Sequence, residues 1–138
     1  MATNTAGDVG RLYQTHQVHY LRKYFTKDDA GNTLDMGYLP PGANVVDGGI
    51  SVIEAFNAGT NNRANLGVST DVDDFGTLLA LGTVGIIKMD ETATCNDHYA
   101  TTAQLVQVQV DVTGTAATTG KAIAWVAFLV PDGLVGSA

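Results

Sequence analysis

The densest group of acidic residues in the chain is Asp71-Val72-Asp73-Asp74. Several carboxylate oxygens at short spacing are the ligands that a hard cation such as calcium prefers. The calcium-binding helix–loop–helix pattern also needs acids at alternate positions, then a glycine and a distant glutamate. Here Gly76 is misplaced and no glutamate follows at the right distance. We therefore interpret the segment as a loop of solvated acids that form turns, and a cation site at Asp71, Asp73 and Asp74 stays open as the alternative.

The chain also has few cysteine and histidine residues that could bind zinc. Cys95 is the single cysteine, and Asp97 and His98 follow it closely. A zinc site needs about four ligands, and the other histidines, His16 and His19, lie far away in the sequence. We predict no metal site, and a single cysteine also excludes a disulfide within the chain.

Catalytic arrangements are also missing from the sequence. The three serines, Ser51, Ser69 and Ser137, do not lie in a Gly-x-Ser-x-Gly turn. Glu54 and Glu91 are the only glutamates; pairing one with an aspartate for glycoside hydrolysis is geometrically possible, but nothing in the sequence favours it. No glycine-rich loop continues into the Lys-Ser/Thr pair that cradles phosphate. We predict a protein that is not an enzyme and has no cofactor.

Length and composition predict a single globular domain. The chain has 138 residues, of which 45% are hydrophobic and 15% charged, which is too apolar for a disordered chain. No apolar run reaches the roughly 18–20 residues of a membrane span, and the polar start lacks the features of a signal peptide. We expect a protein that is synthesised and kept in a cytoplasm, without a membrane partner.

Charge is distributed unevenly along the chain. Up to Lys27 the sequence holds Arg11, Arg22, Lys23 and Lys27 against Asp8, a balance of +3, and the remainder holds three cations against thirteen acids, a balance of −10. An acidic body repels nucleic acid, so we predict no nucleic-acid partner. The basic segment has two interpretations: a solvated strand edge on which lysine discourages aggregation, or an arm that docks on an acidic partner.

Short apolar or alternating runs, separated by turn residues about every ten positions, predict strands. The expected strands are residues 34–39, 43–56, 64–68, 84–89, 104–112 and 121–130. Residues 43–56 are long enough for two strands or one bent strand, and Gly48-Gly49 in their middle predicts a bulge or kink. Residues 57–62 read as a loop. Residues 75–81 fit either a helical turn or a loop. About seven to eight strands without a clear helix predict an all-β fold, an antiparallel, jelly-roll-like β-sandwich.

The final third carries the clearest pattern. Residues 104–112 alternate valine with polar side chains, which is typical of a half-buried antiparallel strand. Residues 113–120 read as a hairpin loop that returns the chain as a partner strand, 121–130. That last strand is apolar on both faces, with Ile123, Trp125 and Leu129 on one and Val126, Phe128 and Val130 on the other. Its second face must be covered, either by the N-terminal segment or by another subunit.

The N-terminal part reads as an extended arm. Its first ten residues are small and polar, and residues 11–26 are rich in aromatic and β-branched types, although Leu21 and Tyr24-Phe25 also fit a helical stripe. We divide the chain into an N-terminal arm with the first extended segment, residues 1–27, and a β-sandwich domain, residues 28–138.

The middle of the chain resembles small structural proteins of tailed bacteriophages. The resemblance covers residues 36–90 and the final apolar hairpin. It rests on the run Leu39-Pro40-Pro41-Gly42-Ala43-Asn44-Val45-Val46, on Ile50-Ser51-Val52-Ile53-Glu54-Ala55-Phe56-Asn57, on Ala64-Asn65-Leu66-Gly67-Val68 and on Asp71-Val72-Asp73-Asp74-Phe75. It implies a capsid decoration or cement protein: a β-sandwich that oligomerises on the outside of the head, as a trimer first and a dimer second, and clamps neighbouring major capsid subunits. Such a protein is made in the host bacterial cytoplasm and ends up on the virion surface. A tail, head-tail connector or fibre domain that binds a glycan or receptor is the alternative.

The expected contacts with such a partner lie in the basic, aromatic N-terminal segment. These candidate partner-binding residues are Arg11, Tyr13, Tyr20, Arg22, Lys23 and Tyr24. Tyr20 and Tyr24 share one face of a strand, so they also suit a carbohydrate-binding platform. Trp125, the only tryptophan, is expected in a buried strand.

Overall fold

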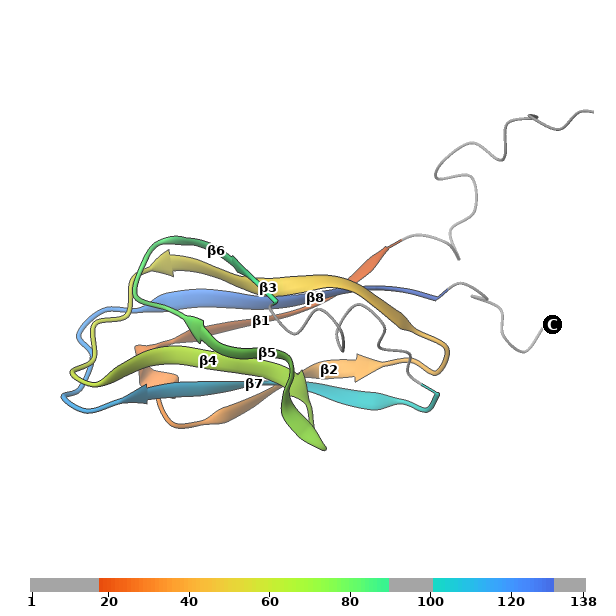
Figure 1. Cartoon of the computed structure of the whole chain (residues 1–138), viewed down its shortest axis with the longest axis horizontal. Helices are drawn as coiled ribbons and strands as arrows, with labels where there is room; N and C mark the ends of the chain where they lie inside the picture. Colours follow the sequence, from red (N-terminus) through yellow and green to blue (C-terminus); the bar gives the residue numbers. More distant parts are fainter. Residues whose placement is uncertain (1–17, 90–100, 131–138) are drawn as a thin grey trace, which may run out of the picture.

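The computed structural model describes residues 18–89 and 101–130 and shows two stacked β-sheets (Figure 1). Within these residues the chain forms eight strands and one short 3-10 helix. They are β1 (His19–Thr26), η2 (Lys27–Asp29), β2 (Thr33–Leu39), β3 (Asn44–Glu54), β4 (Asn61–Val68), β5 (Asp71–Ala80), β6 (Gly85–Lys88), β7 (Gln104–Thr113) and β8 (Lys121–Leu129).

The strands are nested from the outside of the sequence inward. One sheet has the order β1-β8-β3-β6, here called the 1-8-3-6 sheet, and the other has the order β2-β7-β4-β5, the 2-7-4-5 sheet. First pairs with last, second with seventh, third with sixth and fourth with fifth, and every pair is antiparallel. Two four-stranded sheets wound in this way form a jelly-roll-like β-sandwich, so the predicted fold class is confirmed.

The core lies between the sheets, and β7 shows why. Val106, Val108 and Val110 are fully buried and Val112 is nearly so, because side chains alternate across a strand and every second residue of β7 is a valine. Residues of the other sheet pack against them from the opposite side; these are Phe25, Val45, Ile50, Val52, Ala122, Ala124, Val126 and Phe128. The alternation predicted for residues 104–112 is confirmed.

The predicted hairpin between residues 104–112 and 121–130 is wrong. β7 lies in the 2-7-4-5 sheet between β2 and β4, whereas β8 lies in the 1-8-3-6 sheet between β1 and β3. The connecting residues therefore cross from one sheet to the other, where the Asn57 side chain accepts hydrogen bonds from the backbone N–H groups of Thr118 and Thr119. Because the chain crosses between the sheets, the apolar inner face of β8 packs against the valines of β7 and both are buried. In a hairpin the two strands would lie side by side in one sheet, and their inner faces could not cover each other.

Two segments predicted as loops contain strand residues, although residues 57–60 lie outside any strand, as predicted. β4 begins at Asn61, inside the predicted loop 57–62, and residues 71–80 form β5 where we expected an acidic loop followed by a helical turn or loop. Phe75 and Leu79 anchor β5 because both are buried in the core. Its pairing with β4 shifts register twice. Because of these shifts, the sequence of β5 does not show the regular alternation of apolar and polar residues that identifies a strand.

Gly48 and Gly49 do not form the predicted bulge. β3 is one strand in one sheet, and both glycines pair in regular register with β8, while the register shifts lie on either side, between Val45 and Asp47 and between Val52 and Glu54. Glycine is needed here for space. A Cβ on Gly49 would lie 2.4 Å from the carbonyl oxygen of Ile87 in β6.

Residues 19–26, which we expected as the extended end of the N-terminal arm, form β1 and pair with β8 over their whole length. Phe25 anchors this strand in the core, where its ring lies 5.8 Å from that of Phe56. The extended conformation predicted for this part of residues 11–26 is confirmed, and the helical alternative is wrong for it. The proposed division of the chain at residue 27 stays a prediction.

Candidate interaction surface

β1 brings three of the predicted partner-binding residues to one face. Tyr20, Arg22 and Tyr24 alternate with Leu21 and Phe25, which face the core, so the first three point outward from the 1-8-3-6 sheet. Tyr20 and Tyr24 are 62% and 52% exposed.

Not all of the predicted residues join this face. Lys23 is half-buried and has the opposite strand parity, so it is not part of the outward row. Arg11 and Tyr13 lie outside the described residues.

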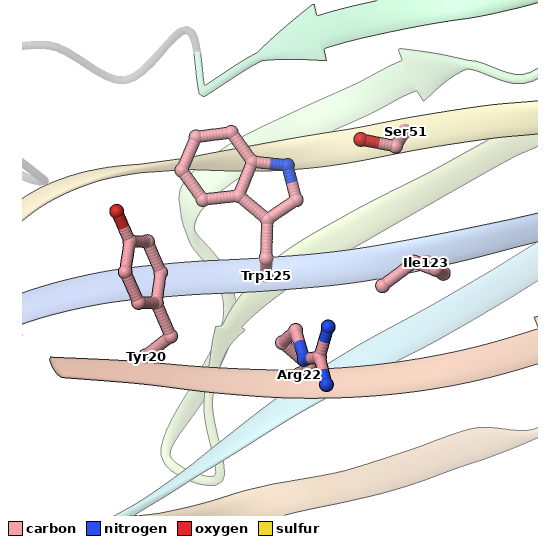
Figure 2. A pocket seen from close by; sticks show the side chains of 5 residues that line it. All are labelled: Tyr20, Arg22, Ser51, Ile123 and Trp125. Carbon is pink, nitrogen blue, oxygen red and sulfur yellow. The ribbon is translucent and has the colours of Figure 1, made fainter.

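Cross-strand pairing continues the face over β8, β3 and β6. Arg22 lies opposite Trp125, which lies opposite Gly49, and Tyr24 lies opposite Ile123, which lies opposite Ser51. An open hollow of about 410 Å³ is lined by Tyr20, Arg22, Ser51, Ile123 and Trp125. Figure 2 shows the indole of Trp125 extending from β8 over β3, with Tyr20 and Arg22 on neighbouring β1 and Ser51 on β3.

Trp125 is the centre of this surface. Its ring lies 6.4 Å from the ring of Tyr20 at an angle of 57°, and the Lys88 ammonium lies 5.2 Å from its centroid. Lys88 also forms an ion pair with Asp47, whose other carboxylate oxygen accepts a hydrogen bond of 2.8 Å from the Gly48 N–H. The indole thus contacts both an aromatic ring and a cation, and both interactions favour the orientation that it has on the surface.

The outer faces of the two sheets differ in chemistry. On the 1-8-3-6 sheet Ile53 and Ile86 are 52% and 64% exposed, close to the exposure of the tyrosines of β1. The middle of the outer face of the 2-7-4-5 sheet is polar and hydrogen-bonded across its strands; its pairs are Gln107–Asp35 at 2.8 Å, Asn65–Gln109 at 2.8 Å and Arg63–Asp111 at 2.7 Å. The exposed large apolar side chains of this sheet, Tyr38 and Leu78, lie on its edge strands β2 and β5. Polar groups that already have partners gain little from a docking protein, whereas exposed aromatic and aliphatic groups gain by burial. The outer face of the 1-8-3-6 sheet, here called the aromatic face because it carries Tyr20, Tyr24 and Trp125, is therefore the better interaction surface.

The structure refines the expectation for the last strand. Its inner side chains Val126 and Phe128 are buried, and on the outer side Ile123 and Trp125 are half-buried. Residues 19–26 lie beside β8 in the same sheet and do not cover its outer face. Trp125, expected to be buried, lines the hollow instead. The sequence signal for this position, which the prediction did not use, is that Trp125 has the opposite strand parity to the buried Val126.

Within residues 18–89 and 101–130, no group of three or more histidine, cysteine or acidic side chains is placed to hold a metal ion. Asp71, Asp73 and Asp74 lie along β5, and Cys95, Asp97 and His98 lie outside the described residues. In the same part of the chain no helix is long and apolar enough to cross a membrane.

Comparison with known proteins reveals similarity of structure. No protein-family model and no curated protein matches the chain. A chain in the capsid asymmetric unit of cyanophage Pam1 matches with a TM-score of 0.66 and 14% identity, over 95% of this chain and 97% of that chain. A chain in the capsid of Ralstonia phage GP4 matches with a TM-score of 0.62 and 18% identity, over 91% and 90%. A chain in the acidic stable capsid structure of Helicobacter pylori bacteriophage KHP30 matches with a TM-score of 0.60 and 18% identity, over 85% and 91%. At these identities the likeness concerns the fold.

Proposed function

We propose that this chain is a structural protein of a phage virion, which binds the outer surface of the head and stabilises contacts between major capsid subunits. The observation that carries the proposal is the fold shared with chains of three phage capsid structures, over at least 85% of this chain and 90% of each of the others. The matches span nearly the whole of this chain and of each of those chains. The resemblance of residues 36–90 to small phage structural proteins points the same way.

The aromatic face of the 1-8-3-6 sheet suits this role. Binding energy at protein interfaces is concentrated in a few buried aromatic and arginine side chains, and Tyr20, Arg22, Tyr24 and Trp125 supply such a group. Arg22 presents a planar guanidinium that pairs with carboxylates of a capsid subunit. A protein that spans the seam between two capsid subunits adds its binding free energy there, and the symmetry of the shell repeats that contribution at every equivalent seam. We expect a trimer first and a dimer second.

The proposal is tested by sedimentation with heads of the parent virus prepared without this protein. The purified chain should sediment with the heads and saturate at a fixed number of copies per capsid subunit. Trp125→Ala should weaken binding about thirtyfold, since a central aromatic residue contributes about 2 kcal/mol. Gln107→Ala, on the outer face of the other sheet, is the matched control and should bind like the unchanged protein. Failure of the unchanged protein to sediment with heads would refute the proposal.

A glycan- or receptor-binding role, as in a tail, connector or fibre domain, is the second candidate. It is favoured by the hollow of about 410 Å³, which combines the rings of Tyr20 and Trp125 with the polar groups of Arg22 and Ser51. Sugar rings stack on aromatic faces, while nearby polar groups bind their hydroxyls. Saturable binding on a glycan array, lost in Trp125→Ala and combined with no binding to heads, would favour this function over the first.

A further inference from the structure

In the part of the chain that the structure describes, the sandwich has four edge strands, and they differ in how they are protected. An unprotected sheet edge offers unpaired N–H and C=O groups to other strands, and proteins blunt such edges with short strands, bulges or charges. β6 has only four residues. The pairing of β2 shifts register between Asp35 and Gly37, and that of β5 shifts twice and includes Leu78 with a φ of +53°. β1 is different: its eight residues run in unbroken register along β8.

The backbone groups on the free side of β1 follow from the ladder. The Lys27 N–H donates to the Gly120 carbonyl at 3.0 Å, which sets the alternation of hydrogen bonds along the β1–β8 pair. In an antiparallel pair every second residue bonds to its partner strand, so residues 19, 21, 23 and 25 face β8. The N–H and C=O groups of Tyr20, Arg22 and Tyr24 therefore point away from it. Among the described residues β8 is the only strand paired with β1.

The end of the strand differs from its middle. Thr26 has the same parity as Arg22, but its N–H donates to an Asp29 carboxylate oxygen at 2.9 Å, which closes the capping box of η2. The open stretch of the edge thus runs from Tyr20 to Tyr24. These residues also carry the side chains that border the hollow over Trp125, so backbone and side-chain binding groups meet at one place.

We propose that β1 is a docking edge to which an extended, acidic segment of a capsid subunit adds as a further strand of the 1-8-3-6 sheet. This proposal rests on the proposed function and specifies how the partner is held. Main-chain hydrogen bonds supply affinity in this mode of recognition, and alternate side chains supply specificity. β1 contains Arg22 and Lys23 and no carboxylate, in a chain whose net charge is −7. An added strand with acidic side chains complements that charge, and its outward carboxylates lie within reach of Arg22.

A second copy of this chain is a poorer occupant of the same edge. Antiparallel pairing of two β1 strands through these open edges, centred on Arg22, places the Arg22 side chains of the two copies directly opposite each other. Like charges directly opposite each other destabilise a strand pair. An acidic segment of a different protein avoids this repulsion.

Two substitutions at one position separate strand addition from side-chain contact. Arg22→Pro removes the outward N–H and blocks an added strand, and proline is tolerated at an edge position whose N–H faces away from the sheet. Arg22→Ala removes the same guanidinium but keeps the N–H. Both variants are measured for binding to heads of the parent virus prepared without this protein, and their folding is checked by circular dichroism. We expect Arg22→Ala to weaken binding about three- to tenfold, and Arg22→Pro at least tenfold beyond Arg22→Ala.

Hydrogen exchange of the unchanged protein provides a second measurement that does not depend on the folding of the proline variant. The protein is exchanged free and on the heads, released, and analysed amide by amide. The amides of Tyr20, Arg22 and Tyr24 should exchange fast in the free protein and at least tenfold more slowly on the heads. Those of Leu21 and Lys23, which bond to β8, should be slow in both states.

The outcomes distinguish this proposal from the function on which it rests. If the unchanged protein binds heads but the two variants bind equally, or the three amides do not slow, strand addition is wrong and the virion role stands. If the three amides are already slow in the free monomer, another part of the chain occupies the edge and the proposal fails. Self-association that Arg22→Pro abolishes would identify a second copy as the occupant and overturn the acidic partner. Absence of any binding to heads refutes both proposals.

Discussion

Gly49 offers a direct test of how tightly the strands of the 1-8-3-6 sheet are packed. We predict that Gly49→Ala destabilises the protein because β6 occupies the space that the new methyl group needs. The added Cβ would lie 2.4 Å from the Ile87 carbonyl oxygen and 3.0 Å from the Lys88 Cα. Both are backbone atoms, so no side-chain rotation relieves the contact.

The size of the effect follows from that geometry. Real Cβ atoms essentially never approach a neighbour more closely than 3.0 Å, so the backbone of β6 or β3 must move by at least about 0.6 Å. Overpacking of this kind costs about 1–3 kcal/mol. For a chain of this length each 1 kcal/mol lowers the melting temperature by about 3–5 °C. Movement of β6 also takes Lys88 away from its position 5.2 Å from the centre of the Trp125 ring.

Urea unfolding followed by circular dichroism measures the change in the free energy of unfolding. Fluorescence of Trp125, the only tryptophan, reports separately on its surroundings in the folded state. The matched control is Gly82→Ala, because a Cβ there meets no atom within 4 Å and the backbone φ is not in the left-handed region. We expect the control to unfold within about 0.5 kcal/mol of the unchanged protein.

Equal stabilities of Gly49→Ala and Gly82→Ala would refute this explanation. A loss of stability without any change in tryptophan fluorescence would show that β6 does not move, and that the strain is absorbed elsewhere. Equal stabilities would also reopen the interpretation of Gly48-Gly49 as a bulge or kink.

Three further changes probe the core, the polar face and the start of the sandwich. Val108→Ala removes two buried methyl groups from β7 and should lower the free energy of unfolding by about 2–3 kcal/mol, measured by urea unfolding; a loss below 0.5 kcal/mol would contradict the assigned core. Arg63→Ala breaks the cross-strand ion pair with Asp111. The side chains of Arg63 and Asp111 are 37% and 27% exposed, so the substitution should lower the free energy of unfolding by no more than about 1 kcal/mol. Added salt should shrink that difference, and a salt-independent difference would argue against an electrostatic contribution. Thr26→Ala removes the hydroxyl of the capping box that includes Asp29 and should cost about 1 kcal/mol, whereas Thr26→Ser should retain most of the stability in thermal unfolding.

Much of the fold could be predicted from local patterns. The valine alternation of residues 104–112 specifies both a strand and the face that it buries, because side chains of a strand point alternately to its two sides. Turn residues about every ten positions specify a protein of many short strands. The same parity predicts that Tyr20 and Tyr24 share one face of a strand, which the structure confirms, and their role in binding stays a prediction.

The partner of each strand could not be predicted in the same way. Sequence proximity suggested that β8 pairs with β7, but pairing is decided by which arrangement buries the most apolar surface, and β8 lies between β1 and β3. Irregular strands were also missed, since the register shifts of β5 break the two-residue period on which sequence reasoning depends.

The sequence by itself determined an acidic all-β chain without a recognisable catalytic motif, because composition, parity and turn chemistry are local properties. Only the tertiary structure decided that Trp125, Lys88 and Tyr20 share one surface. Tyr20 and Lys88 are more than 60 residues apart along the chain. It also decided that Gly49 is required for the approach of β6, and that within residues 18–89 and 101–130 β1 ends the sheet with three pairs of backbone groups turned outward. These features depend on contacts between segments distant in sequence, and such contacts exist only once the two sheets have packed together.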